Sequence, residues 1–252
     1  MADERDETLG RLHAELPVAP SAYDAAGRRC GLLIVDEVNG FATPGAGALA
    51  PAADDPQVAR MVEETDKLAH ALIAQGGPVA AFLDTHQPGK PEPPYPAHCE
   101  RGTGEEELVP QLRWLESTGA ATLIRKDCIN GFVGAIDPAT GRNLVLDWIN
   151  ENALHALIVV GICTDICVMD FVLTLLSARN HGMAPALGDI VVYEPACATY
   201  DLPKATAARL GLPPTAAHPQ PIAHHMGLYF MASRGAIIAD KVVLPPTPTF
   251  PS

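Results

Sequence analysis

Short apolar runs alternate with segments of helical periodicity along most of the chain. The runs are rich in aliphatic and β-branched residues and are bounded by Gly, Pro or Asp, a pattern typical of buried strands. We expect six of them, over residues 31–35, 78–83, 121–124, 156–161, 189–193 and 236–239. Between the first two, Asp55 and Pro56 signal a helix start and Gly76 and Gly77 its end. This alternation predicts an α/β, three-layer, doubly wound fold, with helices on both faces of a mainly parallel, about six-stranded sheet.

The same pattern divides the chain into three parts. Residues 1–28 precede the first expected strand as an N-terminal extension, residues 29–242 form the folded domain, and residues 243–252 form a proline-rich tail. A chain of 252 residues with 48% hydrophobic content can bury a sizeable core in one such domain.

Charge and composition exclude two classes of partner. The net charge is -13 and no Lys/Arg cluster interrupts it, so no nucleic acid is expected to bind. The longest apolar stretch, residues 156–178, contains Asp165 and Asp170, which favours a buried strand, turn and helix over a membrane span.

The N-terminus carries scattered acids where a secretory signal needs a basic start and an apolar run, so we expect a cytoplasmic protein. The six cysteines are accordingly expected to be reduced.

Cys167 is a candidate nucleophile. It lies in the segment VVGICTDICV, where an apolar run stops and Thr164 can cap a following helix. A thiol in the first turn of a helix faces unpaired amides and the positive end of the dipole, so it should lose its proton more easily than a free thiol. The alternative is a cysteine that simply fills the core.

Two further candidates lie where strands are expected to end, Asp36 in GLLIVDEVNGF and Lys126 in LIRKDCINGF. Side chains on different strand ends can meet at one edge of a parallel sheet, where open α/β folds place their sites. There Lys126 would stabilise a Cys167 thiolate, and Asp36 would take the thiol proton and later deliver it to a leaving group. Taken singly, Asp36 can equally be a strand-terminal cap and Lys126 a solvated residue.

A second cluster begins at the end of the second expected strand, in AFLDTHQP. Alternate side chains of an extended chain share a face, so Asp84 and His86 should project together. His98, in PYPAHCERGTG, would complete a ligand set suited to a divalent transition metal with open positions. The alternative is that both histidines are loop residues bonded to the backbone.

Five motifs, in this order, carry a resemblance to a known family: VDEVNGF, LDTHQP, HCERGT, RKDCINGF and GICTDICV. Together they resemble the isochorismatase-like cysteine hydrolase superfamily, and within it the nicotinamidases, most closely their plant-type branch. The resemblance implies a catalytic triad of Asp36, Lys126 and Cys167. It also implies a non-proline cis peptide before Cys163 and an oxyanion hole made by the backbone amides of Cys163 and Cys167.

The resemblance further implies a divalent metal held by Asp84, His86 and His98, zinc before iron or manganese. Some relatives take another ligand from the loop that precedes the HC motif. Here that loop is QPGKPEPPYPA, and its one carboxylate, Glu92, is a further candidate ligand.

This chain departs from the family pattern at several positions. Many microbial relatives read VDxQNDF where this chain reads VDEVNGF, so hydrogen bonding around Asp36 is expected to differ. Phe41 and Tyr95 match the aromatic pair that sandwiches a pyridine ring, with Tyr95 standing where the family often has tryptophan. Cys163 stands where many relatives have alanine, a similarly small residue.

The implied reaction is hydrolysis of nicotinamide to nicotinate and ammonia through a thioester, as part of NAD salvage, by a homo-oligomer. One alternative is an amidase of the same superfamily that acts on an N-carbamoyl or ureido compound; such relatives share the Asp, Lys and Cys but typically lack the metal ligands. The other is a catalytically idle member used for assembly or ligand sensing.

Three further histidines, His218, His224 and His225, fit neither a standard zinc spacing nor a family motif. We expect them on a helix surface or at a subunit contact.

Overall fold

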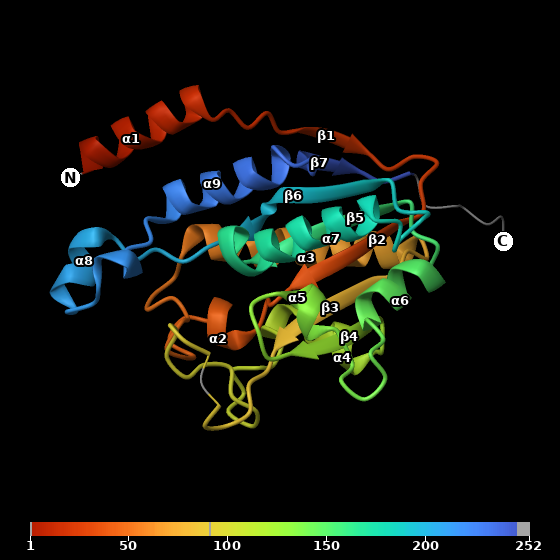
Figure 1. Ribbon diagram of the computed structural model, residues 1–252, viewed down its shortest axis with the longest axis horizontal. Coiled ribbons are helices and arrows are strands. Elements are labelled where there is room, and N and C mark those ends of the chain that lie inside the picture. Colours follow the sequence, from red (N-terminus) through yellow and green to blue (C-terminus); the bar gives the residue numbers. More distant parts are fainter. Residues whose placement is uncertain (1, 91, 246–252) are drawn as a thin grey trace.

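The centre of the molecule is one parallel sheet (Figure 1). A computed structural model describes residues 2–90 and 92–245. Within these residues the sheet has seven strands in the order β1-β7-β6-β5-β2-β3-β4. They are β1 (Ser21–Asp24), β2 (Cys30–Val35), β3 (Val79–Asp84), β4 (Ala121–Lys126), β5 (Ala156–Ile162), β6 (Asp189–Ala198) and β7 (Ile237–Val243). The predicted fold class is confirmed, with one strand more than expected.

Helices cover both faces of the sheet. On one face, helix α3 (Pro56–Ala74) packs on residues of β2 such as Leu32 and Ile34. On the other face, Leu33 and Val35 belong to a separate cluster with helices α6 (Leu144–Glu151), α7 (Met169–Asn180) and α9 (Gln220–Ala232). Shorter helices lie in the connections: α2 (Asn39–Ala42), α4 (Trp114–Ser117), α5 (Gly131–Gly134) and α8 (Lys204–Arg209).

The predicted start of α3 is confirmed. The Asp55 carboxylate accepts hydrogen bonds from the backbone N–H groups of Gln57 and Val58, at 2.8 and 3.1 Å, and Pro56 occupies the first helical position. Such a cap satisfies amides that have no partner within the helix. Strands β2, β3 and β5 are buried along their whole length, which explains why they read as continuous apolar runs.

The segment predicted as an N-terminal extension contributes to the fold. Strand β1 lies in it and pairs with β7 at the sheet edge. Helix α1 (Ala2–Glu15) also lies in it and packs on α9, where the His13 ring lies 4.3 Å from the His225 ring. The sequence pattern missed β1 because only Tyr23 of its short run is buried. Of the predicted tail, residues 246–252 lie outside the described residues.

His224 and His225 were predicted on a helix surface or at a subunit contact, and the surface alternative is wrong, because both are buried in α9. His224 forms a hydrogen bond of 2.8 Å with the Thr164 hydroxyl, and the His225 ring donates to the carbonyl of Leu16 at 3.0 Å. Helix α9 therefore lies between α1 and the segment that follows β5, which leaves its histidines little contact with solvent.

The order of strands creates a switch point between β2 and β5. From β2 the chain builds outward through β3 and β4, and from β5 it builds outward in the other direction through β6 and β7. Sites of doubly wound folds lie at the carboxyl ends of the strands beside such a point. No helix in the described part of the chain is long and apolar enough to cross a membrane.

Candidate active site

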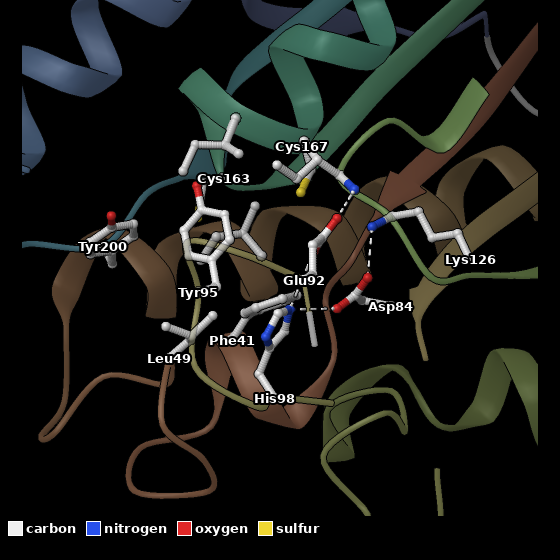
Figure 2. Close-up of a pocket in the computed structure, with 13 residues that line it drawn as sticks. Phe41, Leu49, Asp84, Glu92, Tyr95, His98, Lys126, Cys163, Cys167 and Tyr200 are labelled. Atoms are coloured by element: carbon white, nitrogen blue, oxygen red, sulfur yellow. Dashed lines mark hydrogen bonds and ion pairs between the residues drawn. The ribbon is translucent and has the colours of Figure 1, made fainter. Parts of the chain in front are cut away.

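The carboxyl ends of four neighbouring strands bring together the predicted polar side chains. Asp84 ends β3 and Lys126 ends β4, and the two residues are register partners. Asp36 follows β2 directly, and Cys167 lies in a π-helical turn, Thr164–Val168, after β5. All four are at most 8% exposed. Asp84, Lys126 and Cys167 line one cavity (Figure 2).

Lys126 connects the two predicted clusters. Its Nζ lies 2.8 Å from Oδ2 of Asp36 and 3.0 Å from Oδ1 of Asp84, and it donates to the carbonyl of Cys128 at 3.0 Å. Burial alone would lower the pKa of this ammonium, but the carboxylates of Asp36 and Asp84 hold that pKa well above its usual value. Lys126 is therefore a fixed positive charge and not the solvated residue of the alternative interpretation.

Asp36 occupies a strained backbone position with φ of 54°. Burial raises the pKa of its carboxyl to about 6, although the Lys126 ammonium and the Cys167 thiol oppose the rise. A carboxyl in this range can accept a proton and return it near neutral pH. Its environment thus suits a general base and acid better than a strand-terminal cap.

The Cys167 thiol differs from the prediction. Burial raises its pKa well above the usual value, even though the Lys126 ammonium acts in the other direction. The thiol is therefore protonated at rest, and proton transfer to a neighbouring base must accompany any nucleophilic attack. Burial outweighs the favourable field of a helix start because the charged form loses most of its solvation.

The start of the helix also differs from the prediction. The turn that holds Cys167 is π-helical, and regular α-helix begins only at Met169. Thr164 does not act as an N-cap, because its hydroxyl is bonded to His224. π-helical turns occur frequently at functional sites, and here the turn places Cys167 beside the ends of β2 and β4.

Asp84, His86 and His98 form a compact group of potential metal ligands, with ligand atoms within 4.8 Å of one another. Oδ2 of Asp84 lies 3.1 Å from Nε2 of His86 and 3.2 Å from Nε2 of His98. All three side chains are buried. Burial opposes ionisation of Asp84, but Lys126 and the two imidazoles outweigh it and lower the pKa of the carboxyl.

The donor set fits a divalent cation. Nδ1 of His98 lies 2.7 Å from the carbonyl of Pro96 and therefore carries a proton, which directs Nε2 toward the carboxylate of Asp84. Neither Oδ2 of Asp84 nor Nε2 of His86 has a hydrogen-bond partner. Buried acceptors that converge without partners are costly unless a cation satisfies them. In the alternative interpretation both histidines are loop residues bonded to the backbone. That interpretation explains only the contact made by Nδ1 of His98.

Glu92 lies beside this group. Its Oε2 is 3.6 Å from Nε2 of His86 and 3.8 Å from Nε2 of His98. Its Oε1 accepts a hydrogen bond of 2.8 Å from the backbone N–H of Ile129. One carboxylate oxygen is thus anchored and the other faces the imidazoles, which keeps Glu92 a candidate ligand.

Aromatic residues flank the cavity near His98. The Phe41 ring lies 5.6 Å and the Tyr95 ring 6.1 Å from the imidazole of His98. Both residues line the cavity together with Cys163 (Figure 2). The peptide bond between Ile162 and Cys163 is cis, as the family resemblance implied.

The sequence analysis missed Tyr200, which also lines the cavity. We expected the fifth strand of the pattern to stop at residue 193, whereas β6 continues through Pro195 to Ala198. Proline usually marks the limit of a strand. A longer β6 would have placed Tyr200 at the same sheet edge as Cys167.

Comparison with known proteins gives a consistent result. Residues 30–220 match the family model of the isochorismatase domain. The chain is 52% identical over 212 residues to nicotinamidase 1 of Arabidopsis thaliana, an alignment that covers 84% of this chain and 86% of that protein.

Solved structures share the fold. A nicotinamidase from Bacillus subtilis superposes with a TM-score of 0.60 at 24% identity, covering 84% of this chain and all of that one (100%). A pyrazinamidase from Pyrococcus horikoshii in complex with zinc superposes with a TM-score of 0.56 at 21% identity, covering 86% of this chain and 99% of that one.

Proposed function

The chain belongs to the isochorismatase family, and from this premise we propose that it is a nicotinamidase, which hydrolyses nicotinamide to nicotinate and ammonia. The relative from Arabidopsis, which bears that activity in its name, is similar over most of both chains. The same activity would place the protein in NAD salvage.

One observation carries the proposal: a single ammonium lies between a nucleophile cluster and a metal-ligand cluster. Lys126 contacts Asp36 on one side and Asp84 on the other. A substrate with a hydrolysable amide and a ring nitrogen can use both clusters at once. Nicotinamide has both groups on one small flat ring, which suits a cavity flanked by Phe41 and Tyr95.

The first half of the reaction forms a thioester. Asp36 takes the thiol proton as the Cys167 sulfur attacks the carboxamide carbon, and Lys126 stabilises the developing thiolate. The resulting oxyanion would be held by the backbone N–H groups of Cys163 and Cys167, each contributing on the order of a hundredfold in rate. The C–N bond then breaks, and Asp36 returns its proton to the departing nitrogen, which leaves as ammonia.

The second half restores the enzyme. Asp36, again ionised, takes a proton from a water molecule that attacks the thioester carbon. The C–S bond breaks, Cys167 recovers its proton from Asp36, and nicotinate is released. One amide and one water are consumed, and one carboxylic acid and one ammonia are produced, which in neutral solution become nicotinate and ammonium.

Asp84, His86 and His98 would hold a divalent metal, with Glu92 as the further ligand. When bound, such a metal orients and polarises a substrate that offers it a ring nitrogen. Zinc suits two imidazoles and carboxylates, and the pyrazinamidase from Pyrococcus horikoshii is described in complex with zinc. Phe41 and Tyr95 would hold the pyridine ring so that its carboxamide meets Cys167.

Ammonia release from nicotinamide tests the proposal. It should be measured before and after removal of metal with a chelator, and again after addition of zinc, iron or manganese. We expect activity that falls on chelation and returns with at least one of these metals. If nicotinamide is untouched while an N-carbamoyl compound is hydrolysed, the protein is instead an amidase of the same superfamily that acts on N-carbamoyl or ureido compounds.

A further inference from the structure

Tyr200 closes one end of the cavity. It follows Thr199 just beyond the end of β6 and lines the cavity with Leu49. Figure 2 shows Tyr200 at the end of the cavity remote from both Asp84 and Lys126. It therefore lies away from the metal ligands and from the catalytic ammonium.

His218 holds Tyr200 in place through two contacts. The imidazole stacks on the Tyr200 ring, with centroids 3.9 Å apart and an angle of 11° between the planes. Its Nδ1 also lies 2.8 Å from the carbonyl oxygen of Tyr200. The same histidine thus fixes both the side chain and the backbone of Tyr200.

His218 is an imidazolium in this arrangement. Its Nε2 lies 2.7 Å from Oδ2 of Asp165. A carbonyl oxygen and an ionised carboxylate can only accept, so both ring nitrogens must donate. Although burial opposes the charge on each, their mutual attraction raises the pKa of His218 and lowers that of Asp165. A charged ring over an aromatic face gains cation–π attraction as well.

Asp165 ties this assembly to the turn that carries the nucleophile. It lies in the π-helical turn with Cys167, and its Oδ1 accepts a hydrogen bond of 2.7 Å from the Thr199 hydroxyl. The backbones of Leu202 and His218 also exchange hydrogen bonds of 2.8 and 2.7 Å. Tyr200 is consequently part of a wall that side-chain and backbone hydrogen bonds tie to the turn carrying Cys167.

We propose that Tyr200 determines which substituted pyridine carboxamides the enzyme accepts, and that the ion pair of His218 and Asp165 positions it. The inference rests on the proposed function. With the ring nitrogen toward His98 and the carboxamide toward Cys167, the ring carbon remote from both is C5. Tyr200 faces this carbon and excludes substituents attached to it.

Three substrates test the inference: nicotinamide, 5-methylnicotinamide and, as a control for the metal side of the ring, 6-methylnicotinamide. An extra methyl group in a packed site costs about 1–3 kcal/mol, or about 5- to 150-fold in kcat/KM. We expect the wild-type protein to prefer nicotinamide over the 5-methyl compound by such a factor. Tyr200→Ala should reduce this preference to about threefold or less and leave the ratio for the 6-methyl compound unchanged.

Matched variants separate a wall from a general structural role. Tyr200→Phe keeps the stacked ring and should keep the preference, and Tyr200→Leu serves if the alanine variant does not fold. His218→Gln should weaken the preference in the same direction as Tyr200→Ala, whereas His181→Gln, at an exposed position, should not. Nitrogen NMR of the wild-type protein at neutral pH should show His218 protonated on both ring nitrogens.

The outcomes distinguish the two proposals. Two results would overturn the role of Tyr200 but leave the proposed function standing. One is an equal loss of activity on all three substrates in Tyr200→Ala. The other is a wild-type protein that accepts the 5-methyl compound as readily as nicotinamide. A neutral His218 would overturn the positioning by the ion pair. A wild-type protein that releases no ammonia from nicotinamide would overturn the proposed function and, with it, this inference.

Discussion

Replacing Lys126 by methionine removes the buried ammonium while it keeps a side chain of similar length. In the native structure Nζ lies 2.8 Å from Asp36 and 3.0 Å from Asp84, and the side chains of all three residues are at most 2% exposed. The substitution leaves two carboxylates without their counter-charge where their side chains have almost no exposure to solvent. Removing one partner of a buried ion pair typically costs about 3–5 kcal/mol. For a protein of this size that corresponds to a melting temperature lower by about 6–20 °C.

A matched control is available on the surface. Lys67 also lies between two carboxylates, with Nζ 2.8 Å from Glu63 and 2.9 Å from Glu64, but its side chain is 58% exposed. Lys67→Met should therefore leave the unfolding midpoint within measurement error of the wild-type value, because water solvates the carboxylates that remain.

A double variant tests the cause of the loss. Asp36→Asn removes one of the two stranded charges, so Asp36→Asn/Lys126→Met should be more stable than Lys126→Met alone. Denaturant unfolding in the presence of a chelator is the assay, since a bound cation beside Asp84 could substitute for the ammonium. If Lys126→Met costs no more than Lys67→Met, or if the double variant is the less stable, then burial of charge is not what makes Lys126 important to the fold.

Four other predictions concern the nucleophile, a metal-ligand candidate, the general base and a glycine in β5. Cys167→Ala should abolish ammonia release while nicotinamide still binds, as calorimetry would show; substantial remaining amidase activity would refute the nucleophile assignment. His98→Ala should lower the metal bound per chain in elemental analysis, whereas exposed His181→Ala should not. Because burial raises the pKa of Asp36 to about 6 and the protonated carboxyl cannot accept the thiol proton, kcat/KM should decline as pH falls through about 6; a flat profile down to pH ~4.5 would contradict this role. Gly161→Ala should prevent accumulation of folded protein, because φ is 122° and a Cβ there would collide with the backbone carbonyl of Val35; normal expression and circular dichroism would count against it.

The sequence predicted some strands more accurately than others. Strands β2, β3 and β5 were predicted within one or two residues because burial on both faces leaves an uninterrupted apolar run. Strand β1 carries no such run and owes its place to pairing with β7, which lies more than two hundred residues further along the chain. The length of β6 was underestimated because Pro195 looks like a strand boundary.

The candidate site was likewise predictable only in part from the sequence. Motif order was enough to select Asp36, Lys126 and Cys167, and the metal-ligand candidates with them. The sequence did not reveal that Lys126 lies between Asp36 and Asp84, since that depends on the register of β3 against β4. Nor did it reveal the raised pKa of the Cys167 thiol, which comes from burial and not from the residues beside it in the chain.

The sequence by itself determined the fold class and the family and nominated the candidate reactive groups, because periodicity, capping residues and short motifs are local properties. Only the tertiary structure decided which charges meet, which acceptors stay unpaired and which ring closes the cavity. Electrostatic energy and solvation depend on distance and burial in three dimensions. Groups such as Asp165 and His218, more than fifty residues apart in the chain, therefore acquire their protonation states only when the fold places them 2.7 Å apart.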